Sequence, residues 1–107
     1  MASAYINAKV DLTGTGATVL YTAPSITTAI ITSILVSEDS GSSDTITVTL
    51  TNAAAAVFSL FKVKAVGANT TVELLTRPLV VAEAEIIKVT AATGGRLHVV
   101  ASLLELS

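Results

Sequence analysis

His98 is the residue that could most readily act as an acid, a base or a metal ligand, because the chain contains one histidine and no cysteine. Transition metals need several His, Cys or carboxylate ligands close together, so one histidine without thiolates cannot build such a site. No serine lies in the context of a nucleophile elbow, and no sequence neighbour is placed to orient His98. We therefore predict no catalytic, cofactor-binding or metal-binding residues, and a structural or interface role for His98.

Two groups of carboxylates could also take part in chemistry. Glu83 and Glu85 are separated by one residue at the start of a predicted strand, which places both on one face. A general acid and base pair could use that arrangement, but no histidine or lysine partner accompanies it, so the pattern favours an exposed strand edge. Glu38, Asp39 and Asp44 offer oxygen ligands for a cation, but the regular spacing of an EF-hand loop is missing. These three residues are predicted to lie in a solvated hairpin loop.

The segment "TGTGAT" at positions 13–18 resembles the start of a phosphate-binding loop. Gly14 and Gly16 are followed by Val19 where the dinucleotide-binding pattern has its third glycine, and no strand–helix–strand unit surrounds the segment. A hairpin turn that requires positive φ at its glycines is the favoured interpretation.

The chain carries few charges for its size. Charged residues make up 13% of the 107 residues and apolar residues 51%, whereas about a quarter of a typical globular chain is charged. Weakly charged surfaces associate readily, so we expect a homo-oligomer or a part of a larger assembly. The net charge is −2 and the six basic residues are scattered, which gives no electrostatic footprint for nucleic acid.

Two further patterns bear on location. The opening "MASAYINAKV" lacks the apolar core of a signal peptide, and the longest apolar run, "AIITSILV", is too short to span a bilayer. We therefore expect no membrane partner and synthesis in the cytoplasm.

Strand patterns recur about every ten residues, with turn signals between them. In "DTITVTLTN" the apolar residues Ile46, Val48 and Leu50 alternate with threonines, which predicts a strand with one face on a core. The alanines at 53–56 leave that segment open between helix and turn. The whole chain, 1–107, is predicted to form one all-β domain, an antiparallel β-sandwich of jelly-roll type with about eight short strands. The predicted extended segments are 3–12, 17–22, 26–37, 44–52, 57–65, 72–75, 79–81, 85–91 and 96–106.

In one of these segments, alternation predicts which side chains share a face. Simple alternation through 26–37 places Ile30, Ile34 and Val36 on one face, and Ile31 and Leu35 on the other.

The last segment, "RLHVVASLLEL", is apolar on both faces. Leu97, Val99 and Leu103 form the more continuous set and are predicted to lie in the core. A sheet face exposed to water should be polar, so the opposite face is predicted to contact another subunit through His98, Val100 and Leu104.

Several segments resemble small β-sandwich virion proteins of tailed bacteriophages, of the capsid decoration or cement type. The resemblance is carried by the "VLYTAP" run, by "TTAIITSILVSE", by "VELLTRPL", by "IKVTA" and by "GRLHVVASLLEL". Many relatives have a Gly-Asp turn before the "IKVTA" strand, where this chain has Ala84 and Glu85, which places the turn geometry in question. The resemblance implies a non-enzymatic, symmetric β-sandwich associated with a capsid or tail.

These observations lead to one functional hypothesis with two alternatives. The protein is predicted to be a capsid decoration protein that binds the outside of the assembled head, with the major capsid protein as partner and a homotrimer as the favoured oligomer. It would be made in the host cytoplasm and located in the virion, at the capsid surface. The alternatives are a tail, fibre or head–tail connector component, and a carbohydrate-binding β-sandwich module.

Overall fold

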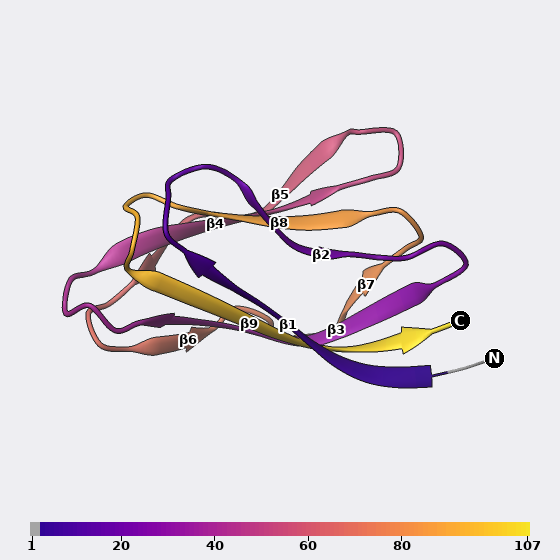
Figure 1. Ribbon diagram of the computed structural model, residues 1–107, viewed down its shortest axis with the longest axis horizontal. Helices are drawn as coiled ribbons and strands as arrows, with labels where there is room; N and C mark the ends of the chain where they lie inside the picture. Colours follow the sequence, from indigo (N-terminus) through magenta and orange to yellow (C-terminus); the bar gives the residue numbers. More distant parts are fainter. Residues whose placement is uncertain (1–2) are drawn as a thin grey trace.

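The computed structural model describes residues 3–107, which form nine β-strands and no helix within that range (Figure 1). Accordingly, no helix in residues 3–107 could cross a membrane. The alternating apolar and threonine-rich segments account for the strands, because β-branched side chains fit the pleated surface of a half-buried sheet. The strands are β1 (Ser3–Leu12), β2 (Thr18–Thr22), β3 (Thr28–Glu38), β4 (Asp44–Thr51), β5 (Val57–Val66), β6 (Thr71–Glu73), β7 (Leu79–Val81), β8 (Ile86–Ala91) and β9 (Leu97–Leu106).

The strands form two antiparallel sheets. Sheet A has the order β1-β9-β3-β6, with β7 also paired to β3, and sheet B has the order β2-β8-β4-β5. If β6 and β7 are counted as two halves of one interrupted strand, eight strands form sheets of order 1-8-3-6 and 2-7-4-5. That order is the jelly-roll arrangement of two Greek keys. The predicted all-β sandwich of jelly-roll type is confirmed.

The core lies between the two sheets and consists almost entirely of aliphatic side chains. Ile46 and Val48 of β4 face inward and are fully buried, while the alternating Thr45, Thr47 and Thr49 are half-buried on the outer face. Leu97, Val99 and Leu103 of β9 are at most 2% exposed. The predicted inward face of the last strand is therefore confirmed.

The grouping of side chains by face in β3 differs from the predicted one because a β-bulge interrupts the alternation. The register with β9 shifts between Ile31 and Ser33, and the extra residue reverses which side chains face the core. Ile31 is buried before the bulge, and Ile34 and Val36 are buried after it. Leu35, which simple alternation grouped with Ile31, is 40% exposed instead.

The same place in β3 is where the neighbouring strand is interrupted. β6 ends at Glu73, and the Glu73 carboxylate accepts hydrogen bonds from the backbone N–H of Ile34 at 2.8 Å and of Leu75 at 3.1 Å, and from the Ser33 hydroxyl. Burial alone would raise the pKa of Glu73, but these hydrogen bonds outweigh it and lower the pKa. Where β6 ends, the Glu73 carboxylate thus accepts the Ile34 N–H in place of a backbone carbonyl of a continuing strand.

The predicted turn at 13–16 has a different geometry from the one expected. The "TGTG" segment does not close a hairpin, because β1 lies in sheet A and β2 in sheet B. Positive φ is found at Gly41 and Gly95 and not at Gly14 or Gly16. Gly94 is required for a different reason, since a Cβ there would lie 2.4 Å from the carbonyl oxygen of Thr13.

The open segment 53–56 forms a turn and not a helix. The side-chain oxygen of Asn52 accepts hydrogen bonds from the backbone nitrogens of Ala54 and Ala56 at 3.0 and 2.9 Å. Ala55 has φ +67°. The asparagine therefore organises the link between β4 and β5 and does not begin a helix.

Candidate interaction surface

The outer face of sheet A carries all three residues that the sequence assigned to a subunit contact. Val100 of β9 is 38% exposed, while His98 and Leu104 are half-buried on the same face. Their neighbours follow from the strand register, because directly opposite residues of an antiparallel pair lie on the same face. The structure therefore places His98, Val100 and Leu104 together on one surface.

An apolar row crosses this face from one edge of sheet A to the other. Val80 of β7 pairs with Ile30 of β3, Ile30 pairs with Leu104 of β9, and Leu104 pairs with Tyr5 of β1. Val80 is 57% exposed and Tyr5 is 90% exposed. We call Val80, Ile30, Leu104 and Tyr5 the apolar row, and it lies where a monomer exposed to water would place polar side chains.

A second row crosses the same face at Val100, four residues before Leu104 in β9. Leu35 of β3 pairs with Val100, and Val100 pairs with Lys9 of β1. On the other side of Leu35, Glu73 completes the row. The centre of the face thus has two adjacent exposed aliphatic side chains between one acid and one base, which is typical of an interface patch with a polar rim.

His98 marks the end of this face and has two carboxylate partners that sequence reasoning missed. Its Nε2 lies 3.2 Å from Oδ1 of Asp11 on β1, and its Nδ1 lies 3.6 Å from Oδ2 of Asp39 after β3. All three side chains are more than 40% exposed, so the group is a solvated polar cluster with little effect on stability. It is a charged boundary to the aliphatic centre of the face.

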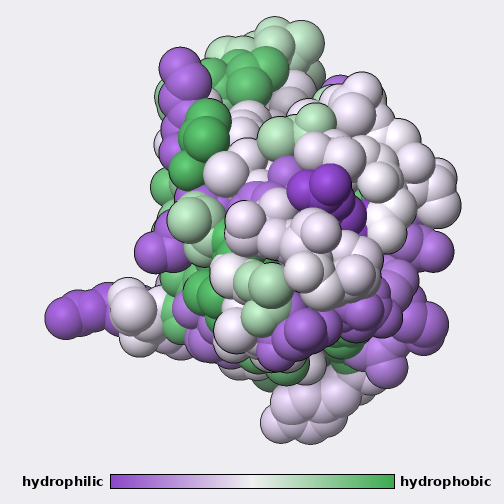
Figure 2. Space-filling model, turned by 90° about the vertical axis from the view of Figure 1, so that its left-hand side faces the viewer, coloured by the Kyte–Doolittle hydropathy of each residue, from purple (hydrophilic) through white to green (hydrophobic). Residues whose placement is uncertain are grey.

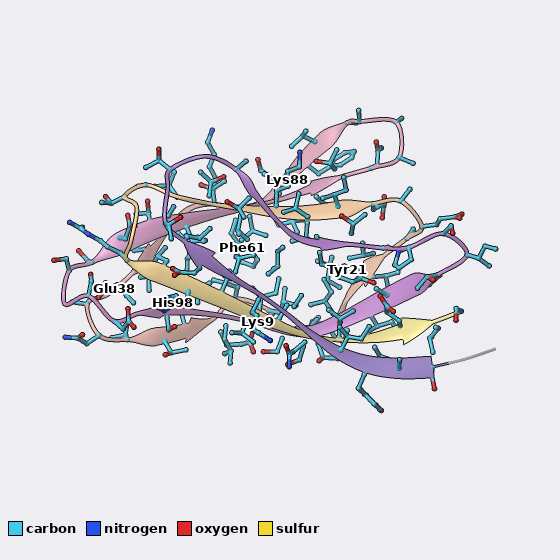
Figure 3. The ribbon with its side chains drawn as sticks, viewed as in Figure 1. Lys9, Tyr21, Glu38, Phe61, Lys88 and His98 are labelled. Carbon is cyan, nitrogen blue, oxygen red and sulfur yellow. The ribbon has the colours of Figure 1, made fainter. Side chains whose placement is uncertain are left out.

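Glu38 organises the loops at this end of the sandwich. It is 2% exposed, and its carboxylate accepts hydrogen bonds from the backbone nitrogens of Ser40, Gly41 and Asn69 at 2.9, 3.1 and 3.0 Å, and from the Ser40 hydroxyl. Burial by itself raises the pKa of Glu38, but the hydrogen bonds from Ser40, Asn69 and Gly41 outweigh it and lower the pKa to about 2. Figure 3 shows Glu38 and His98 at the same left-hand end of the molecule.

The segment from Glu38 to Asp44, which links β3 to β4, is therefore not the solvated hairpin loop that the sequence predicted. β3 and β4 lie in different sheets, so the loop crosses the sandwich. Asp44 is 7% exposed, and its carboxylate accepts the backbone N–H of Thr45 at 2.8 Å and of Thr93 at 3.1 Å. Only Asp39 of the three carboxylates is exposed as predicted.

Glu83 and Glu85 do not share a strand face, because both precede β8 and lie in the turn after β7. Glu83 accepts the backbone N–H of Ile26 at 2.7 Å, and Glu85 accepts the backbone N–H of Ala82 at 2.9 Å. Ala84 between them has φ +66°. These carboxylates fix the backbone of a turn.

Tyr21 makes a polar contact between the two sheets. Its hydroxyl, from β2, donates a hydrogen bond to Glu105 of β9. Burial, together with the hydrogen bond to Glu105 and its negative charge, raises the pKa of Tyr21 above the ordinary range of a phenol. In Figure 3 the ring lies between the sheets, which identifies Tyr21 as part of the packing and not of an exposed site.

The outer face of sheet A carries two hollows along β1 and β9. The hollows along β1 and β9 are open ones, lined in one case by Tyr5, Asn7 and Leu104 and in the other by Lys9, His98 and Val100. No group of three or more His, Cys, Asp or Glu side chains among the described residues could hold a metal. Figure 2, which views the loop end directly, shows mostly neutral and hydrophilic surface, with hydrophobic residues along the left-hand side and at the top.

Comparisons with known proteins inform the fold. No protein-family model matches the chain, and no curated protein matches it in sequence. One similar solved chain comes from Bacillus endospore appendages, which form a family of disulfide-linked pili. It is 7% identical, with a TM-score of 0.60 over 99% of this chain and 87% of that chain. Another comes from infectious bursal disease virus strain Gt, at 8% identity and a TM-score of 0.45, covering 98% of this chain but 30% of that one. The first likeness shows a shared sandwich fold.

Proposed function

We propose that this protein is a non-enzymatic structural component that decorates the outside of an assembled tailed-phage head. The outer face of sheet A carries the proposal. It has the apolar row at one end, Leu35 and Val100 at its centre, and a charged boundary at His98. Such a face fits a flat protein surface better than a small substrate, because only shallow hollows lie on it.

Two further observations support a structural role. The jelly-roll sandwich is shared with a subunit of Bacillus endospore appendages. The segments that resemble phage decoration proteins include most of β2, β3, β6, β8 and β9, so they supply the two central strands of sheet A, β3 and β9. The partner would be the major capsid protein and the location the capsid surface. The homotrimer that we favour from the sequence remains a prediction.

The experiment that tests the proposal is co-sedimentation with assembled heads. The probe is expanded heads of the tailed phage to which the proposal assigns this chain, compared with the major capsid protein of that phage as free subunits. A decoration protein should bind heads and bind free subunits weakly, because an assembled lattice presents several weak contacts together. Equal binding to both forms would count against decoration.

A filament or fibre component is the second candidate. It is favoured by the likeness to the appendage subunit, which covers 99% of this chain. This chain has no cysteine, so its copies could not be linked by disulfides. Negative-stain electron microscopy of concentrated protein separates the candidates, since a filament subunit should form fibres without heads. The carbohydrate-binding alternative would act through the loops, and no tryptophan is present to stack on sugars.

A further inference from the structure

The two sheets have four edges, and three of them are protected against pairing with another chain. Unpaired strand edges are templates for association, and proteins protect them with short strands or bulges. β6 and β7 have three residues each, and β2 has five residues with a register shift between Val19 and Tyr21. β5 has two register shifts against β4, with φ +53° at Val63.

β1 is the exception. It is ten residues long and pairs with β9 alone, and its register runs without a shift from Ser3 opposite Leu106 to Leu12 opposite Leu97. It contains no proline. Lys9 could discourage pairing, but its side chain is on the outer face, where its Nζ donates a hydrogen bond to Asn7 at 3.1 Å. The backbone along the other side of β1 is thus available to a further strand.

We propose that β1 pairs antiparallel with β1 of a second copy of this chain, around a twofold axis at Ala8. Residues 4–12 of both copies then face each other. Ile6 lies opposite Val10 of the second copy on the inner face, which joins two apolar side chains that are only half-buried in one copy.

Charge also favours this register. On the outer face Asn7 lies opposite Lys9 of the second copy, and Tyr5 lies opposite Asp11. Each of these pairs can join a donor to an acceptor, and no like charges meet. A register centred one residue later would place Lys9 directly opposite itself, which is unfavourable.

The pairing has a consequence that rests on the proposed function. A twofold axis perpendicular to the sheet keeps the outer faces of both copies on the same side. The pair therefore presents two apolar rows to one surface, and the second contact becomes intramolecular once the first has formed. A twofold pair is a different unit from the predicted trimer, and the mass of the free protein distinguishes them.

Cysteine cross-linking tests the pairing directly, because the chain has no cysteine of its own. Residues opposite each other at the axis have Cα atoms about 4.5–5.5 Å apart, within reach of a disulfide. Ala8→Cys should form a covalent dimer under mild oxidation at least about tenfold faster than Ser59→Cys, an exposed control on the bulged edge strand β5. Equal rates for the two variants would overturn the pairing.

A second variant keeps the test independent of disulfide geometry. Asn7→Lys places a positive charge opposite Lys9 of the second copy on the exposed outer face, and light scattering coupled to gel filtration should show a monomer with an unchanged circular dichroism spectrum. Ser59→Lys should keep the mass of the wild type. A wild type that is monomeric at high concentration, or whose mass is unaffected by Asn7→Lys, would refute the pairing. Head binding by the wild type in either case would leave the proposed function standing.

Discussion

The Glu38 carboxylate accepts the backbone N–H of Asn69 at 3.0 Å and so connects two loops that are 31 residues apart in the sequence. The same carboxylate holds the nitrogens of Ser40 and Gly41 in its own loop. One buried acid therefore fixes both the link between β3 and β4 and the link between β5 and β6, next to the charged boundary formed by His98.

This arrangement predicts a loss of stability in acid. The pKa of Glu38 is lowered from 4.5 to about 2 on folding. A depressed folded-state pKa contributes stability that is fully present above the unfolded value and is lost as the pH falls through the folded value. The unfolding free energy should therefore decrease between about pH 4.5 and pH 2, with a smaller contribution from Glu73, whose pKa is also lowered.

Denaturant titrations of the wild type and Glu38→Gln at several pH values check the assignment. The amide cannot ionise and presents one acceptor in place of two, so the variant should be less stable near neutral pH and the difference should shrink in acid. Asp39→Asn is the matched control, since Asp39 is exposed, and it should change little. A difference between wild type and Glu38→Gln that stays constant with pH would contradict the role of the charge.

Replacing Ala84 with glycine should stabilise the protein. Its φ of +66° is unfavourable for any residue with a Cβ. Ala84→Gly should raise the unfolding free energy by about 1 kcal/mol, as measured by thermal or chemical unfolding. Ala82→Gly, in the same turn without positive φ, should instead be neutral or destabilising. A loss of stability in Ala84→Gly would mean that the turn has another geometry.

Gly94 should not tolerate a methyl group. A Cβ would lie 2.4 Å from the carbonyl oxygen of Thr13, so the link between β8 and β9 would have to separate from the link after β1. Gly94→Ala should cost about 2 kcal/mol or more in unfolding free energy. Gly14→Ala, where no atom lies within 4 Å of the added carbon, should have little effect. Equal effects of the two changes would show that these loops do not meet.

The two neighbouring leucines at the end of β9 should behave differently. Leu103 is 2% exposed in the core, so Leu103→Asp should bury an unpaired charge and unfold the protein. Leu104 belongs to the apolar row, and Leu104→Asp should remain folded while losing contacts with partners. Circular dichroism and thermal melts of both variants check this, and a folded Leu103→Asp would contradict the assignment of the faces.

The fold could be predicted because most strands alternate without interruption. Leu97, Val99 and Leu103 point inward as their spacing indicates. Simple alternation gave the wrong faces in β3 because the bulge after Ile31 adds one residue, and nothing in the local composition distinguishes that residue from its neighbours. The bulge lies beside the interruption between β6 and β7, where the backbone N–H of Ile34 donates to Glu73, 39 residues away in the sequence.

The candidate site was only partly predictable for a related reason. The outward positions of His98 and Val100 follow from the same alternation. The partners of His98 come from β1 and from the loop after β3, and the apolar row combines four strands, so both depend on the strand order. A polar composition predicted a solvated loop around Glu38, but backbone nitrogens from two loops satisfy its buried carboxylate.

The central claim is that the outer face of sheet A attaches this protein to an assembled head. The most direct measurement is quantitative co-sedimentation of the wild type, Leu104→Asp and Ser59→Asp with expanded heads of the phage to which the proposal assigns this chain. We predict that the wild type and Ser59→Asp pellet with the heads, and that the folded Leu104→Asp protein stays in the supernatant or binds at least about tenfold more weakly. Binding by Leu104→Asp equal to that of the wild type, or a wild type that stays in the supernatant, would contradict the account.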